Sequence, residues 1–119
     1  MQAGSSGVIN DRMEAIMLLN RQGEIVFVTD AILAISGYDR RELVGKRIFD
    51  FFQGKDLRAR YESIVAQPNL TLGAVFGMRT KSGLVIRVEL TIRNLLHLPD
   101  LGGVVVAVRY PATNPNGPD

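Results

Sequence analysis

The chain has 119 residues, a net charge of +2 and no cysteine, so it is long enough to bury a core in one domain without disulfides. The absence of cysteine also excludes zinc–thiolate sites and thiol nucleophiles, and it is typical of proteins in the reducing cytoplasm. Acidic and basic residues are interspersed, and no apolar run reaches the ~20 residues of a membrane-spanning helix, so we expect neither nucleic acid nor membrane as a partner.

The two ends of the chain differ in composition from its middle. Residues 1–10 are mostly polar and rich in glycine and serine, and residues 112–119 are rich in proline and asparagine. Such segments seldom pack into a core. We therefore expect a flexible leader over residues 1–10, one folded domain over residues 11–111, and a flexible tail or linker over residues 112–119.

Two short apolar runs separated by "NRQG" predict a β-hairpin, with strands at residues 17–19 and 25–28. Asp30 follows the second strand and is a typical N-cap, so we expect a short helix to begin there. Gly37 ends this helix, since glycine readily adopts the left-handed conformation of a C-cap.

Two more helices are predicted in the middle of the chain. Asp39 and Glu42 have the spacing of a capping box, which predicts a short helix that ends at Gly45. Asp56 is a predicted N-cap for the longer helix "LRARYESIVAQ", which Pro68 ends.

The second half of the chain has the alternation of strands. In "VIRVELTIR" every second residue is apolar, which predicts a strand with one buried face. "LTLGAVFGMR" before it and "GGVVVAVRY" after it predict two more strands, joined by turn-forming segments. The predicted fold is α+β, with a five-stranded antiparallel sheet and short helices on one face.

These motifs, in this order and spacing, resemble the PAS sensory domain family. "LLNRQGEIVFVTDAILAISGYDRRELVGKRIFDFF" is similar to the N-terminal half of a PAS domain, and "RTKSGLVIRVELTIRNLLHLPDLGGVVVAVR" to its C-terminal half. The resemblance implies a sensory domain in signal transduction rather than an enzyme. It also implies an attached or partner output domain, such as a kinase, a cyclic-dinucleotide enzyme or a transcription regulator.

The chain departs from the family pattern after its last strand. The resemblance implies an Asp-Ile/Val-Thr motif and a coupling helix there, but the chain reads Tyr110-Pro111-Ala112. Proline lacks the backbone N–H and disfavours helix in the preceding residue. This argues against output through a C-terminal helix and leaves the other end of the chain or the sheet surface as the route.

The resemblance implies an apolar pocket between the sheet and the helices, for a small apolar or amphipathic ligand. The residues themselves are equally consistent with a filled core and a module that only dimerises or docks a partner, so both alternatives stay open. Tyr61 offers a hydroxyl that could orient a ligand. By alternation and helix face, the candidates for the pocket wall are Ile35, Ile48, Phe52, Leu57, Tyr61, Ile64, Met78, Val88, Leu90 and Val108.

No cofactor is expected in this pocket. Flavin-binding relatives carry a reactive cysteine at the position of Ile48 and amide side chains at those of Met78, Val88 and Val108, so the polar edge of a flavin would lack hydrogen bonds here. Haem-binding relatives supply a histidine from the helix "LRARYESIVAQ", whereas the only histidine here is His97, in a loop. We also expect no metal site and no catalytic residues, since the sequence has no Ser-His-Asp set and no phosphate loop.

The outer face of the sheet is predicted to be partly apolar, because outward positions of two strands carry valine and alanine. An apolar sheet face is commonly covered by another surface. We therefore expect a symmetric homodimer. The interface candidates are Val8, Ile9, Val75, Val105 and Ala107.

Overall fold

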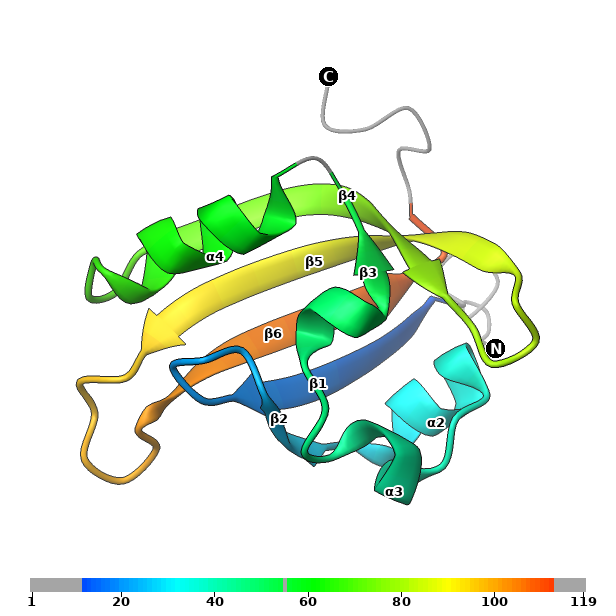
Figure 1. The fold of residues 1–119 in the computed structure, drawn as a ribbon, viewed down its shortest axis with the longest axis horizontal. Coiled ribbons are helices and arrows are strands. Elements are labelled where there is room, and N and C mark those ends of the chain that lie inside the picture. The colour runs from blue at the N-terminus through cyan, green and yellow to red at the C-terminus, as the bar shows by residue number, and fades with distance from the viewer. Residues whose placement is uncertain (1–11, 55, 113–119) are drawn as a thin grey trace, which may run out of the picture.

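The computed structural model describes residues 12–54 and 56–112, where six strands form one antiparallel sheet in the order β2-β1-β6-β5-β4-β3 (Figure 1). The predicted leader and almost all of the predicted tail lie outside the described residues. The elements are β1 (Met13–Leu19), β2 (Ile25–Val28), α2 (Asp30–Ser36), α3 (Arg40–Leu43), the 3-10 helix η1 (Ile48–Asp50), β3 (Phe52–Gln53), α4 (Leu57–Val65), β4 (Thr71–Arg79), β5 (Val85–Leu95) and β6 (Gly103–Tyr110).

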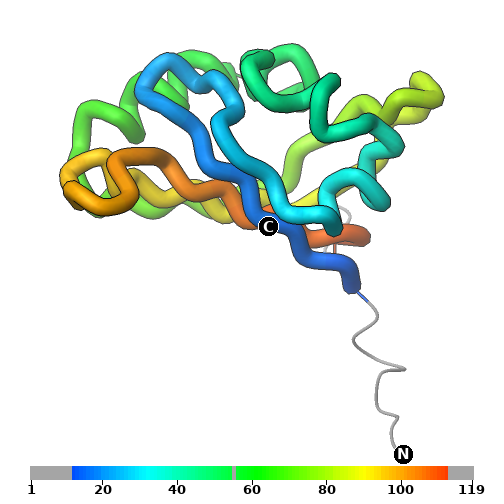
Figure 2. Tube along the Cα trace, turned by 90° about the horizontal axis from the view of Figure 1, so that it is seen from below, coloured from blue at the N-terminus to red at the C-terminus, as the bar shows by residue number. Residues whose placement is uncertain are grey.

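The predicted α+β fold is confirmed, with the helical segments lying on one side of a curved sheet (Figure 2). The sheet has six strands rather than the predicted five, because β3 adds a short edge strand that pairs with β4 through Phe52 and Met78. A strand of two residues is too short to show alternation. The first strand begins at Met13 rather than at the expected residue 17. The start of the strand is hidden in the sequence because the outward-pointing Glu14 interrupts the apolar run.

The two ends of α2 follow the predicted signals with one correction. The N-cap of α2 is Thr29 rather than Asp30, and the Thr29 hydroxyl accepts a hydrogen bond from the Ile16 amide at 2.9 Å, which ties the start of the helix to β1. Gly37 ends α2 in the left-handed conformation, at φ 81°, as predicted.

The capping box before α3 is present, with the Asp39 amide donating to the Glu42 carboxylate at 2.8 Å. This helix ends at Leu43, not at Gly45. Asp56 precedes α4 as predicted, but its side chain makes no capping hydrogen bond, and the helix ends at Val65, before Pro68.

The core lies between the inner face of the sheet and the helices. The alternation of β5 places Val88, Leu90 and Ile92 in this core, each at most 1% exposed. Burying an aliphatic side chain of this size contributes about 1.5–3 kcal/mol to folding. No helix in the described part of the chain is both long and apolar enough to cross a membrane.

Candidate functional site

All ten residues predicted for the pocket wall belong to one buried cluster between the helices and the inner sheet face. The most exposed of them, Ile35, is 7% exposed. They come from α2, η1, β3, α4 and the three long strands, so the fold brings together residues that are far apart in the sequence. The chemistry available there is dispersion and apolar contact, apart from one hydroxyl on Tyr61.

The Tyr61 hydroxyl donates to the backbone carbonyl of Asn20 at 2.6 Å, and burial of the side chain raises the pKa of this hydroxyl. The ring packs edge-on against Phe49, with centroids 5.6 Å apart. Tyr61 therefore connects α4 to the β1–β2 turn, and its proton already points at a carbonyl of the protein.

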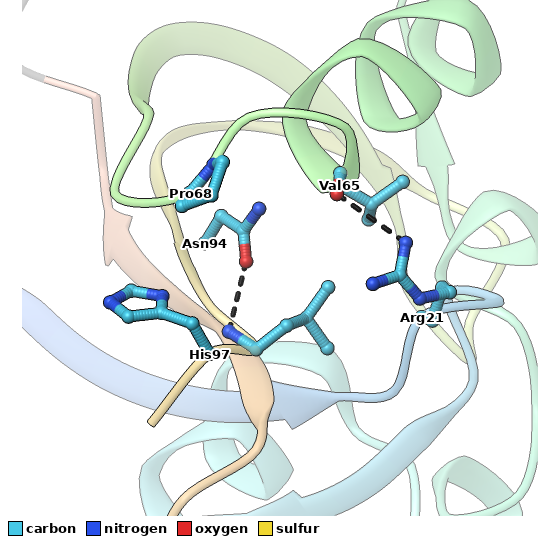
Figure 3. Close-up of a pocket in the computed structure, with 6 residues that line it drawn as sticks. Arg21, Val65, Pro68, Asn94 and His97 are labelled. Carbon is cyan, nitrogen blue, oxygen red and sulfur yellow. Dashed lines mark hydrogen bonds between the residues drawn. The ribbon is translucent and has the colours of Figure 1, made fainter. Parts of the chain in front are cut away.

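The buried polar side chains have structural partners. The Ser36 hydroxyl donates to the Ile32 carbonyl at 2.7 Å, within α2. The Asn94 amide donates to the carbonyls of Ile64 and Gln67, at 2.7 and 2.9 Å, and thereby caps the C-terminal end of α4. In the close-up, the Asn94 side-chain oxygen accepts a hydrogen bond from the neighbouring Leu96 amide (Figure 3).

A surface hollow of about 120 Å³ lies beside Asn94, between the end of α4 and the β5–β6 loop. Arg21 and His97 lie on opposite sides of it, and the Arg21 guanidinium approaches the Val65 carbonyl at 3.4 Å (Figure 3). The His97 side chain is exposed. No group of three or more His, Asp or Glu side chains that could hold a metal occurs among residues 12–54 and 56–112.

A wider and shallower hollow of about 300 Å³ lies between α2 and the β4–β5 hairpin. Ile35, one of the predicted pocket residues, reaches the surface here, together with the hydroxyl-bearing side chains of Ser36 and Thr80. Leu84 at its rim is 65% exposed. The opening is lined mainly by apolar and hydroxyl groups and has no charged side chain in its wall.

The outer sheet face carries a continuous apolar row across three strands. Phe27 of β2 pairs with Leu18 of β1, which pairs with Val105 of β6, and two residues further along β1 Ile16 pairs with Ala107. Directly opposite residues point to the same face of a sheet. We define these five residues as the outer row.

Two of the predicted interface residues, Val105 and Ala107, belong to the outer row and are half-buried in the single chain. Val75 lies on the same face but two strands away, opposite Glu89. Val8 and Ile9 fall outside the described residues. Sequence reasoning missed the other three members of the row, Ile16, Leu18 and Phe27.

Two of the missed members, Ile16 and Leu18, could be recognised only by the alternation of inward and outward side chains along β1. Ala15, Met17 and Leu19 are completely buried, so the residues between them must point outward. Such a strand is apolar on both faces, which hides its alternation.

Charged pairs border the outer row at one end of the strands. Glu14 of β1 pairs with Arg109 of β6 at 3.2 Å, and Arg12 pairs with Glu89 of β5 at 2.6 Å. The outer face therefore consists of an apolar centre with a polar border.

A model of the PAS domain family matches residues 13–108 of the chain. The chain belongs to the PAS domain family. The predicted family is thereby confirmed, and PAS domains are sensory and signalling modules. A search of curated protein sequences gives no match.

Solved structures of other PAS domains share this fold. The PAS domain of an HTR-like protein from Haloarcula marismortui aligns with a TM-score of 0.69 and 18% identity, over 81% of this chain and 83% of that one. A domain of a sensory box sensor histidine kinase/response regulator from Geobacter sulfurreducens aligns with a TM-score of 0.65 and 22% identity, over 82% of each chain.

Drosophila melanogaster Cycle PAS-B, with bound ethylene glycol, aligns with a TM-score of 0.65 and 17% identity, over 80% of this chain and 96% of that one. At these identities the three likenesses show a common fold.

Proposed function

We propose that this PAS domain is a non-catalytic signalling module that pairs with a second copy through its outer sheet face and regulates an attached or partner output domain. The observation that carries the proposal is the outer row, in which five apolar side chains are contiguous across three strands. Phe27, at 52% exposure, and its neighbour Val26, at 51%, are the most exposed large apolar side chains of the sheet strands. A second copy would remove this apolar surface from water, at about 25 cal/mol per Å².

The charged pairs at one end of the row also suit a symmetric pair, while Arg93, opposite Val105 on β5, places one further cation beside the row. The same patch meets itself across a two-fold axis, so an apolar centre faces an apolar centre. The bordering pairs, Glu14 with Arg109 and Arg12 with Glu89, are neutral as pairs and add no net repulsion between the copies. A sensor kinase is one class of output that fits, because the similar Geobacter domain comes from a sensor histidine kinase/response regulator.

The test is the mass in solution, measured by size exclusion with light scattering, of the wild type and of Val105→Glu. We expect twice the chain mass for the wild type at micromolar concentration and the single mass for Val105→Glu, because the new carboxylate would lose its contact with water in the apolar centre of the interface, even beside Arg93 on the neighbouring strand β5. Leu98→Glu is the matched control, since it places the same charge at an exposed apolar residue in the β5–β6 loop, outside the row. A monomeric wild type, or a fully dimeric Val105→Glu, contradicts the proposed interface.

A second function is binding of a small apolar or amphipathic ligand by the ten core residues. It is supported by the gathering of all ten in one cluster and by the ethylene glycol bound to Cycle PAS-B, which has the same fold. The alternative is a filled core in a module that only dimerises or docks a partner.

Mass spectrometry of freshly purified protein, under native and under denaturing conditions, separates these alternatives. A ligand gives a native mass above the denatured mass. Leu90→Trp gives a second readout, because Leu90 lies 1% exposed in the cluster. Overpacking a filled core costs roughly 1–3 kcal/mol or more, whereas filling a ligand cavity costs little. Equal masses together with a strongly destabilised Leu90→Trp would contradict ligand binding.

A further inference from the structure

A third surface hollow, of about 230 Å³, lies where the β1–β2 turn, η1 and α4 meet. Aromatic rings of Phe49 and Tyr61 form part of its wall. It opens on a part of the surface that belongs neither to the outer row nor to the hollow between α2 and the β4–β5 hairpin.

Three arginines line this hollow, each supplied by a different segment. Arg21 lies in the β1–β2 turn, Arg47 immediately precedes η1, and Arg58 lies in the first turn of α4. The only carboxylate in the wall is that of Glu62. The lining therefore carries an excess of positive charge in a protein whose net charge is only +2.

None of these three arginines forms an ion pair within the described part of the chain. Glu62 lies one helical turn beyond Arg58, yet the two side chains form no salt bridge. Elsewhere on the surface, Arg40 and Arg109 do pair with carboxylates, at 2.5 and 3.2 Å. Arginines left unpaired and close together repel one another, and an anion between them relieves that repulsion.

The local contacts hold the hollow in shape. The Asn20 side-chain oxygen accepts hydrogen bonds from the Gln22 and Glu24 amides, at 3.0 and 2.9 Å, and so fixes the turn that carries Arg21. The Ile48 amide donates to the Gly23 carbonyl at 2.9 Å, which fastens η1 to that turn.

The Arg58 guanidinium is also placed, because it lies over the Phe49 ring at 4.4 Å from the centroid. A wall that is ordered before binding lowers the entropic cost of binding.

We infer that this hollow binds a small anionic ligand that carries a phosphate or several carboxylate groups. A guanidinium presents a planar fork of donors that matches phosphate and carboxylate oxygens. The volume lies below the roughly 300–1,000 Å³ of drug-sized sites, which favours a compact anion. The hollow shares Tyr61 with the core cluster, but its arginines lie outside both that cluster and the outer row, so the test with Arg47→Gln and Arg58→Gln is independent of the proposed function.

The test uses inorganic phosphate and citrate as probes, titrated into the protein at constant ionic strength with chloride as the balancing anion, and followed by calorimetry. The variants are Arg47→Gln and Arg58→Gln. Arg60→Gln is the matched control, since Arg60 lies two residues beyond Arg58 in α4, is also exposed and does not line the hollow. Thermal melts of all three variants establish that the fold is retained.

We expect saturable binding of at least one probe, weakened ~tenfold or more by Arg47→Gln and by Arg58→Gln, because each removes a charge-assisted hydrogen bond. The control should bind within about twofold of the wild type. The probe that binds more tightly shows whether the hollow prefers phosphate or carboxylate groups. The inference is overturned if neither probe binds at millimolar concentration, or if Arg60→Gln weakens binding as much as the other two variants.

Discussion

At the scale of single residues, the β1–β2 turn depends on the glycine at position 23. Gly23 has a φ of 86°, and a Cβ atom built on it would lie 2.9 Å from the Phe49 ring. Only glycine combines that backbone conformation with the close approach of the ring. The turn, η1 and α4 can meet at this point because the side chain is missing, and the hollow with three arginines is formed by that meeting.

Replacing Gly23 by alanine should therefore destabilise the protein for two reasons. The left-handed conformation alone costs about 1–2 kcal/mol for a residue with a Cβ atom, and the contact with Phe49 adds to it. Gly45→Ala is the control, because Gly45 has a φ of 90° but nothing within 4 Å of its Cβ position. Urea unfolding of both variants should show the larger loss for Gly23→Ala; equal losses would mean that Phe49 moves aside freely.

At the scale of elements, a surface ion pair connects α3 to the β4–β5 turn. Lys81 contacts the Glu42 carboxylate at 3.0 Å, and Glu42 also accepts the capping-box hydrogen bond from the Asp39 amide. The hydrogen bond from the Asp39 backbone, followed by the one from Lys81, lowers the pKa of Glu42 below its ordinary value of 4.5. One carboxylate thus stabilises the start of a helix and attaches that helix to the sheet.

This arrangement predicts a pH-dependent contribution to stability. Because the pKa of Glu42 is lower in the folded state, its contribution is present above the unfolded pKa and is lost as the pH falls through the folded pKa. Glu42→Gln should therefore lower the melting temperature at pH 7, and the difference from the wild type should shrink in acid. Asp100→Asn, in an exposed loop, serves as the control for removal of a carboxylate. A difference between wild type and Glu42→Gln that persists unchanged in strong acid would contradict this role.

At the scale of the whole molecule, the helices lie on one face of the sheet, and no element of the described residues covers the other face. The closed side contains Ile48, Met78, Val88 and Val108, the positions at which the family resemblance implies contacts to a flavin, and each is apolar and at most 1% exposed. The open side contains the outer row. The molecule thus separates a buried apolar cluster, which could receive a ligand, from a surface suited to a second copy.

The purified protein is predicted to be colourless. A flavin ring among these four residues would leave polar atoms buried without hydrogen bonds, and the β5–β6 loop holds the only histidine of the chain. Absorption spectra should show no band near ~450 nm or ~400 nm, the regions of flavin and haem, before or after incubation with either cofactor. A band retained through gel filtration would overturn the prediction.

The sequence by itself determined the elements whose signals are local. The alternation of β5, the capping box at Asp39 and Glu42, and the glycine at the end of α2 each act over a few residues, so they can be recognised without the fold. The same is true of the family, because its motifs succeed one another along the chain. The ten residues predicted for the pocket wall are all buried, since strand and helix periodicities decide which side chains point inward. Their role in holding a ligand stays a prediction.

Only the tertiary structure decided which of these pieces are neighbours. β3 exists because β4 pairs with it, and the outer row exists because β6 lies beside β1, which joins Leu18 to Val105 across a long stretch of sequence. Arg21, Arg47 and Arg58 are likewise brought to one hollow by the packing of a turn, η1 and α4. Local patterns carry no information about such contacts, because strand order and helix docking depend on the free energy of the whole packed core.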